Sequence, residues 1–236
     1  MGRYDSLSDV TLTGSVASAE RVTGFLRAVY SWMCVGLAVT AIVAYYVAGT
    51  DWARMIATNR WLLFGLFAVQ LGAVITLSAG ASRLSPGTAS LIFLGYSALT
   101  GVTFSYILLL YTGQSIATTF FITAGMFGAL AIFGTTTSRS LAGWGQFLFM
   151  GLIGVILASV VGIFWQNDAL QFLISFVGVI VFTGLTAYDA QRLKVMALAI
   201  PEGSQGSYAI VGALSLYLNF VNLFLSLLRF TGGRRD

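Results

Sequence analysis

The sequence contains no histidine, one cysteine (Cys34) and one lysine (Lys194), and only 8% of its 236 residues are charged. Without histidine there is no Ser-His catalytic pair and no HExxH zinc motif. A single cysteine cannot form a disulfide within the chain, and no cluster of zinc-ligating residues remains. A typical soluble domain has about 25% charged residues. These absences exclude several enzyme classes and a soluble fold, and they indicate an integral membrane protein.

Long apolar runs are what the sequence has in their place. Apolar residues make up 58% of the chain, and the mean hydropathy is +0.89. A helix needs roughly 20 residues to cross the hydrocarbon core, and backbone groups in lipid must pair within the protein. The charge-free stretches therefore predict an all-α integral membrane protein with seven transmembrane helices. They lie near 25–48, 61–81, 88–110, 116–134, 144–165, 169–190 and 208–229. The predicted organisation is a polar amino-terminal tail over 1–24, a transmembrane domain over 25–230 and a short basic tail over 231–236.

The distribution of the basic residues helps to predict the orientation of the chain in the membrane and the kind of partner it binds. With seven spans and a cytoplasmic amino terminus, the inside carries Arg3, Arg21, Arg27, Arg83, Arg139, Arg192 and Lys194, and the outside carries Arg54, Arg60, Arg229, Arg234 and Arg235. A re-entrant last segment would return the carboxyl terminus to the inside, which the positive-inside rule favours. Yet residues 208–228 are long enough to cross, so we predict seven spans. The arginines punctuate apolar runs and form no patch, which predicts a lipid bilayer and no nucleic acid as partner.

One acid stands apart from the other seven. Asp189 directly follows the apolar stretch 169–188, whereas the other acids fall in tails or connections. A carboxylate at membrane depth costs several kcal/mol unless it is paired, protonated or facing water. Two interpretations stay open on this pattern alone. The sixth span either ends here, with Asp189, Gln191, Arg192 and Lys194 wetted at the interface, or it carries Asp189 into the bundle.

A polar stripe marks the seventh span. Its members, spaced by four, three and four residues, are Ser215, Asn219, Asn222 and Ser226. This spacing places them on one helical face, which forms either a hydrogen-bonded seam between helices or the wall of a water-filled path. Thr186 and Asp189 share a face of the sixth span. If the two faces meet, they form a polar centre with Asp189 as its only acid. Without a second acid or an activated nucleophile, we expect no enzymatic activity.

Two carboxy-terminal motifs carry a family resemblance. Gly184-Leu-Thr-Ala-Tyr-Asp-Ala-Gln191 and Gly212-Ala-Leu-Ser-Leu-Tyr-Leu-Asn-Phe-Val-Asn-Leu-Phe224 resemble the Bax inhibitor-1 family, in particular its bacterial inner-membrane members. The resemblance implies seven helices with the last enclosed by the other six, and a pH-sensitive calcium leak. In that scheme two aspartates on the sixth and seventh helices share a proton and gate the pore. Asp189 matches the first, and Arg83 is the nearest candidate for an arginine that locks it.

The second gating position departs from that pattern. It corresponds to Asn219, and an asparagine cannot titrate, whereas two close carboxylates titrate as a unit. The sequence therefore predicts the polar centre without the coupled switch. Calcium prefers several oxygen ligands, usually including carboxylates. Asp189 and Asn219, aided by Asn222, Ser215 and carbonyl groups, would make a weak calcium site, which suits a permeant ion because permeation needs release. No cofactor is expected.

Three candidate functions are consistent with these features of the sequence. The first is a calcium leak gated near Asp189, in a multi-pass protein of the bacterial inner membrane with a cytoplasmic amino terminus. The second is a non-conducting adaptor that binds a membrane-embedded quality-control protease or another membrane complex through residues 1–20 and the helix surfaces. A proton-coupled transporter with Asp189 as carrier is weaker, because only one buried acid is available and the sequence shows no substrate pocket.

Overall fold

A computed structural model describes residues 3–165, 167–201 and 204–233 of the chain. The described residues form eight helices: α1 (Arg3–Ala48), α2 (Asp51–Thr58), α3 (Arg60–Ala79), α4 (Pro86–Leu110), α5 (Gly113–Thr136), α6 (Ala142–Phe164), α7 (Asp168–Ala199) and α8 (Gln205–Thr231). Seven of them, all except α2, are long and apolar enough to cross a membrane. The prediction of an all-α protein with seven transmembrane helices is therefore confirmed.

Local sequence explains where several helices begin. The side chain of Asn59 accepts the backbone N–H groups of Trp61 and Leu62 at the start of α3. Asn167 does the same for α7. Ser85 accepts the N–H of Thr88 at the start of α4. Such side chains satisfy N–H groups that have no partner within the helix, which stabilises a helix start by about 1 kcal/mol.

Helix α2 lies between the first two spans, and no sequence pattern predicted it. Its eight residues bury Ala53 and Ile56 completely and leave Trp52 and Met55 exposed. It packs against α1, α3 and α4. At eight residues it is too short to cross the bilayer, and its exposed tryptophan is typical of a helix at the membrane surface.

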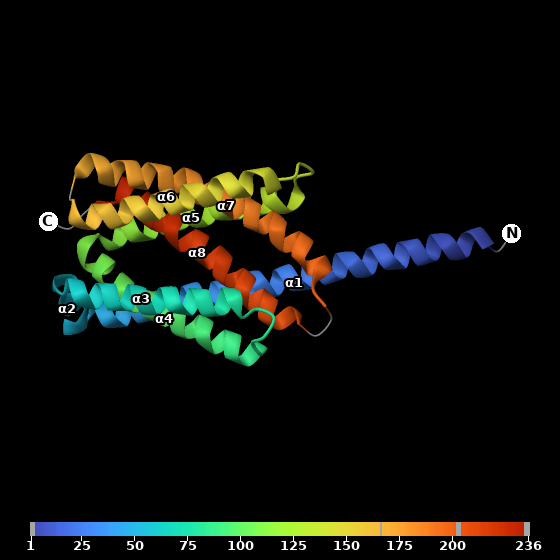
Figure 1. The fold of residues 1–236 in the computed structure, drawn as a ribbon, viewed down its shortest axis with the longest axis horizontal. Coiled ribbons are helices and arrows are strands. Elements are labelled where there is room, and N and C mark those ends of the chain that lie inside the picture. Colours follow the sequence, from blue (N-terminus) through green and yellow to red (C-terminus); the bar gives the residue numbers. More distant parts are fainter. Residues whose placement is uncertain (1–2, 166, 202–203, 234–236) are drawn as a thin grey trace.

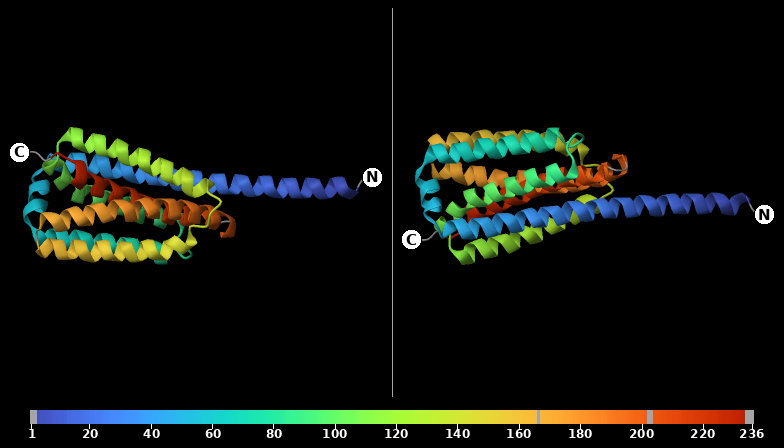
Figure 2. Two further views of the ribbon diagram at one scale, coloured as in Figure 1. Left: turned by 90° about the horizontal axis from the view of Figure 1, so that it is seen from above. Right: turned by 90° about the horizontal axis from the view of Figure 1, so that it is seen from below.

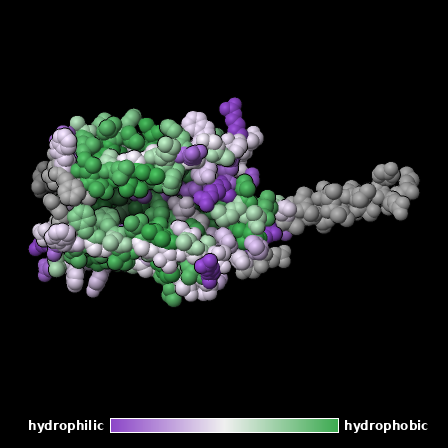
Figure 3. All heavy atoms as spheres, in the orientation of Figure 1, coloured by the Kyte–Doolittle hydropathy of each residue, from purple (hydrophilic) through white to green (hydrophobic). Residues whose placement is uncertain are grey.

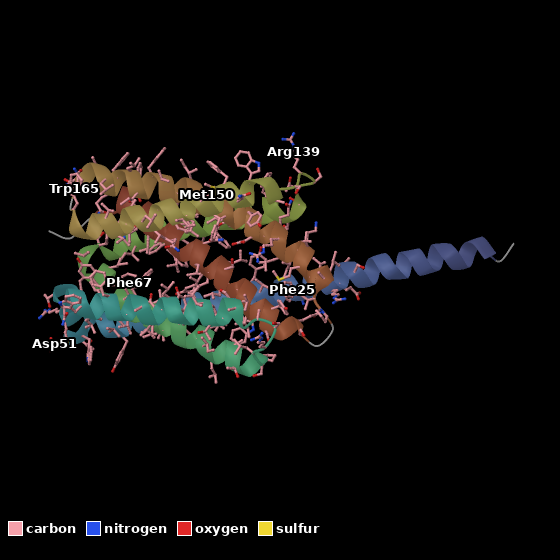
Figure 4. All side chains as sticks on the ribbon, viewed as in Figure 1. Phe25, Asp51, Phe67, Arg139, Met150 and Trp165 are labelled. Atoms are coloured by element: carbon pink, nitrogen blue, oxygen red, sulfur yellow. The ribbon has the colours of Figure 1, made fainter. Side chains whose placement is uncertain are left out.

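The helices run back and forth, and the two termini lie at opposite ends of the bundle (Figure 1). Asp51 and Trp165 mark one end, and Arg139 marks the other (Figure 4). The last helix, α8, is continuous from Gln205 to Thr231 and crosses the full bundle. The alternative of a re-entrant last segment is therefore wrong. An apolar band covers the side of the bundle seen in Figure 3, and the most hydrophilic residues gather toward its ends.

The first helix is longer than the predicted first span. Its amino-terminal part extends well beyond the bundle as a single straight helix (Figures 1 and 2). The segment apolar enough to cross the membrane begins at Ser18 and ends at Ala48. The predicted span of 25–48 thus matches the end of this helix but not its start, because no proline or capping signal separates the polar tail from the span.

Six of the seven spans form two groups, and the seventh, α8, lies between them (Figures 1 and 2). The first group consists of α1, α3 and α4, together with α2, and the second of α5, α6 and α7. Helix α8 contacts α1, α3 and α4 on one side and α5 and α7 on the other. In its most apolar stretch 67% of the residues are buried, against 11–39% in the other spans. It is the central helix, although its enclosure by all six others stays a prediction.

Two glycines allow close backbone contacts within the groups. A Cβ atom at Gly134 of α5 would overlap the carbonyl group of Ala187 in α7. A Cβ atom at Gly101 of α4 would lie 2.7 Å from the carbonyl oxygen of Thr40 in α1. Small residues at such crossings let helices approach closely, which favours dispersion contacts in the absence of a hydrophobic driving force.

Candidate functional site

Asp189 lies inside α7 and not at its end. The helix continues through residues 190–199 and stops at Ile200, which is extended because Pro201 follows it. Residues 190–199 are mostly good helix formers, and Leu193 and Ala197 among them are buried. Asp189 itself is only 7% exposed. The alternative in which the sixth helix ends at Asp189 is therefore wrong.

Two side chains of α8 bind the Asp189 carboxylate. The Ser215 hydroxyl donates to Oδ2 at 2.7 Å, and the Asn219 side-chain amide donates to the same oxygen at 2.8 Å. An amide nitrogen can only donate, so the carboxylate oxygen is the acceptor. These three residues form what we call the polar centre. Hydrogen bonds to a charged acceptor are stronger than bonds between neutral groups, so the polar centre links α7 to α8 tightly.

A cation lies beside the polar centre. Arg192, one turn further along α7, places its Nη1 atom 3.9 Å from Asp189 Oδ1. This is the one ion pair among the described residues, and its distance is too long for a hydrogen bond. The Arg192 side chain is 58% exposed, so solvent weakens the attraction. One of the two interpretations of the sequence placed Arg192 at a wetted interface, and the i, i+3 spacing is the signal that pairs it with Asp189.

Other predicted members of the polar centre bond to their own helices. Thr186, fully buried, donates to the carbonyl oxygen of Phe182. The Asn222 amide donates to the carbonyl oxygen of Leu218 at 2.8 Å. Ser226 donates to the carbonyl oxygen of Asn222. The polar stripe of α8 thus divides, and only its first two members face Asp189.

Arg83, the candidate lock, lies elsewhere in the fold, and so does Gln70, a buried polar residue. Arg83 is exposed in the connection between α3 and α4 and makes no ion pair with Asp189. Its role as a lock stays a prediction. Gln70 is buried and donates to Thr103 at 2.8 Å and to the carbonyl oxygen of Leu99 at 3.2 Å. It holds α3 against α4.

The polar residues that follow Asp189 have protein partners. The Gln191 amide donates to the carbonyl oxygen of Arg139, and its oxygen accepts the backbone N–H of Leu141 at 2.7 Å. Lys194 donates to the carbonyl oxygen of Thr135 at 2.8 Å. The negative end of the α5 helix dipole also stabilises a cation at this place. The turn of α7 around Asp189 therefore binds α8 and also holds the connection between α5 and α6.

A second buried polar group lies on the opposite side of α8, and no sequence pattern predicted it. The Tyr217 hydroxyl lies 2.6 Å from the Thr40 hydroxyl of α1. Thr40 in turn bonds to the carbonyl oxygen of Ser97 in α4 at 2.9 Å. We call these three residues the hydroxyl cluster. Thr40 and Tyr217 are 177 positions apart, so their contact leaves no signal in local spacing.

The chemistry of the polar centre is that of a single acid. Residues 3–165, 167–201 and 204–233 contain no group of three or more His, Cys, Asp or Glu side chains that could hold a metal ion. Asp189 can take up a proton or attract a cation. In the observed geometry its Oδ2 atom is already engaged by two donors.

The chain is similar to several known proteins. A family model described as "Inhibitor of apoptosis-promoting Bax1" matches residues 22–236. The inner membrane protein YbhL of Escherichia coli (strain K12) is 50% identical over 215 residues, which cover 89% of this chain and 92% of that protein. A protein of Deinococcus radiodurans is 39% identical over 232 residues, covering 98% of this chain and 99% of that protein. The matched length and these identities show that the chain belongs to the Bax inhibitor-1 family of membrane proteins.

Proposed function

We propose that this protein is a pH-sensitive calcium leak of the bacterial inner membrane, gated at the polar centre. The observation that supports the proposal is the buried carboxylate of Asp189, held between α7 and α8 by Ser215 and Asn219. A carboxylate inside a membrane bundle is expensive, and such residues usually mark ion or proton paths. Helix α8, which provides the two donors, is the most buried span.

The observed geometry fits a closed gate. Asp189 Oδ2 accepts two hydrogen bonds, and the Arg192 cation lies 3.9 Å from Oδ1. Both features oppose the approach of a divalent cation, which needs free oxygen ligands. Opening would separate Asp189 from the donors of α8 and turn the carboxylate toward the path. One carboxylate with amide and hydroxyl oxygens binds calcium weakly, and weak binding permits release.

The pH sensitivity is assigned to Asp189 alone. Asn219 donates to the carboxylate through an amide that does not titrate. It therefore makes, at every pH, the contact that a shared proton makes in a pair of carboxylates. We expect a shallow dependence of flux on pH, set by a single proton, and a steeper one when a second carboxylate couples to the first.

The test is calcium flux into proteoliposomes from pH 6 to pH 8. Asp189→Asn should abolish the leak, and Asn219→Asp should steepen its pH dependence. Asn222→Asp is the matched control, because the Asn222 amide bonds to its own helix and not to Asp189. It should leave the steepness unchanged. Folded protein that gives no flux above empty liposomes in any variant would rule out the leak.

The proposed orientation places the end that bears Arg83, Arg139, Arg192 and Lys194 in the cytoplasm. These basic residues lie in or near the connections at the end from which α1 extends. Cytoplasmic loops carry an excess of lysine and arginine. The orientation is tested with Arg139→Cys in a Cys34→Ser background. The new thiol is exposed to an impermeant thiol reagent. Labelling in intact cells would contradict the orientation.

One observation favours the adaptor function as a second candidate. Helix α1 extends beyond the bundle as far as Arg3, where another protein could reach it (Figure 2). On this proposal, deletion of residues 1–17 abolishes binding to a membrane-embedded quality-control protease, and Asp189→Asn does not. A leak predicts the reverse, with flux that survives the deletion and is lost with Asp189. Co-purification and flux measured on the same two variants separate the candidates.

A further inference from the structure

The hydroxyl cluster and the polar centre lie on opposite faces of the same turn of α8. Tyr217 is two positions from both Ser215 and Asn219. Each residue advances a helix by about 100°, so Tyr217 points about 160° away from its two neighbours on the stripe. Tyr217 is fully buried. A rotation of α8 cannot move one face without moving the other.

The direction of the hydrogen bonds in the hydroxyl cluster follows from its acceptors. Thr40 has one hydroxyl proton, and it lies 2.9 Å from the carbonyl oxygen of Ser97 and 3.0 Å from that of Gly36. Carbonyl oxygens cannot donate. Because Thr40 has carbonyl acceptors for its only proton, it is free to accept the proton of the Tyr217 hydroxyl, which lies 2.6 Å away. The phenol therefore takes part in a hydrogen bond and is not only a space-filling group.

The surroundings of Tyr217 leave it little freedom. The rings of Phe93 and Tyr96 from α4 each meet the Tyr217 ring edge-on at 5.8 Å. Thr40 lies where α1 and α4 approach closely, because Gly101 faces its carbonyl oxygen. Packed rings in this geometry fix a side chain more firmly than area burial alone. The residues that hold Tyr217 in place therefore belong to α1 and α4.

We propose that Tyr217 is a positioning residue that sets the rotation of α8, so that Ser215 and Asn219 meet Asp189. A rotation by about 20° displaces an atom at the helix surface by about 2 Å. Such a displacement breaks a hydrogen bond of 2.8 Å, because bonds weaken steeply beyond their normal range. Residues of α1 and α4 thus control a contact between α7 and α8 whose hydrogen bonds involve neither α1 nor α4. This inference rests on the proposed function, since it concerns the gate.

The experiment uses the small number of asparagines in the chain. There are four, namely Asn59, Asn167, Asn219 and Asn222. Selective ¹⁵N labelling of their side-chain amides gives four pairs of NMR signals from the full-length protein in lipid nanodiscs. The Asn219 pair is assigned by its loss in Asn219→Gln. Asp189→Ala then gives the signal position of Asn219 without its acceptor. The measurement needs no ion gradient, so a protein without flux would end the leak proposal and still allow this test.

The hydroxyl of Tyr217 is removed in Tyr217→Phe, and its acceptor in Thr40→Val. Each variant should shift the Asn219 signals toward their position in Asp189→Ala, and the double variant should shift them no further. Thr40→Ser retains the hydroxyl and should restore the original position. Thr123→Val is the matched control, because Thr123 is fully buried and donates only within α5, to the carbonyl oxygen of Thr119. It should shift nothing.

Two results would overturn the inference. One is an unchanged Asn219 signal in Tyr217→Phe and in Thr40→Val, and the other is an equal shift in Thr123→Val. Asn59 and Asn167 cap α3 and α7, so their signals report whether each variant is folded. If Tyr217→Phe does not fold, the comparison of Thr40→Val with Thr40→Ser decides the question alone.

Discussion

The two faces of α8 differ in charge and in their access to water. Toward α7, Ser215 and Asn219 bind a carboxylate whose neighbour Arg192 is mostly exposed. Toward α1, Tyr217 binds Thr40 in a neutral and fully buried group. Neutral hydroxyls keep the same hydrogen bonds over the physiological pH range, whereas a carboxylate can change its charge. We therefore expect the face toward α1 to hold α8 in place and the face toward α7 to respond to pH.

The largest effect is expected from Asn219→Leu. This variant leaves the Asp189 carboxylate without one of its two donors, and hydrogen bonds to charged groups contribute about 1.5–3 kcal/mol. The free energy of unfolding in bicelles, measured by steric trapping, should fall by that amount. Asn222→Leu is the control, since the Asn222 amide bonds to its own helix, and it should change little. Equal losses in the two variants would mean that the Asp189 contact adds nothing specific.

A smaller effect is expected from Tyr217→Phe. The variant keeps the ring and its contacts with Phe93 and Tyr96, and removes one neutral hydrogen bond. Hydrogen bonds between membrane helices contribute about 0.6 kcal/mol on average. The same unfolding measurement should give a loss of about 0.5–1 kcal/mol. A loss as large as that of Asn219→Leu would contradict the ranking of the charged face above the neutral one.

The smallest effect on stability is expected from Arg192→Gln. The pair with Asp189 is long and its cation is 58% exposed, and exposed ion pairs contribute about 0–1 kcal/mol. The free energy of unfolding should therefore change by less than about 1 kcal/mol at 0.15 M salt. Calcium flux is the more sensitive readout, because removing the cation removes a repulsion and should increase the leak. A decrease in flux would show that Arg192 does not oppose the ion.

Much of the candidate site was visible in the spacing of polar residues. The intervals among Ser215, Asn219 and Asn222 predicted one helical face, and an acid beside an apolar run predicted Asp189. Helical periodicity says which side chains share a face, but not where a face ends. Asn222 shares the stripe yet bonds to Leu218, because an amide side chain can find a partner on its own backbone. The contacts of Arg83 could not be predicted, since nothing in a turn between helices specifies which residues it meets.

The transmembrane spans could be predicted from composition because the bilayer imposes a length and forbids unpaired backbone groups. Asp189, Ser215 and Asn219 could be named for a similar reason, since polar groups are rare and costly in lipid. The continuation of α7 beyond Asp189, the split of the stripe and the bond between Thr40 and Tyr217 depended on how distant helices pack. The contacts of Asp189 with α8 join residues 26 and 30 positions apart, and the bond between Thr40 and Tyr217 joins residues 177 positions apart. Packing of that kind is a property of the folded bundle and leaves no local trace in the chain.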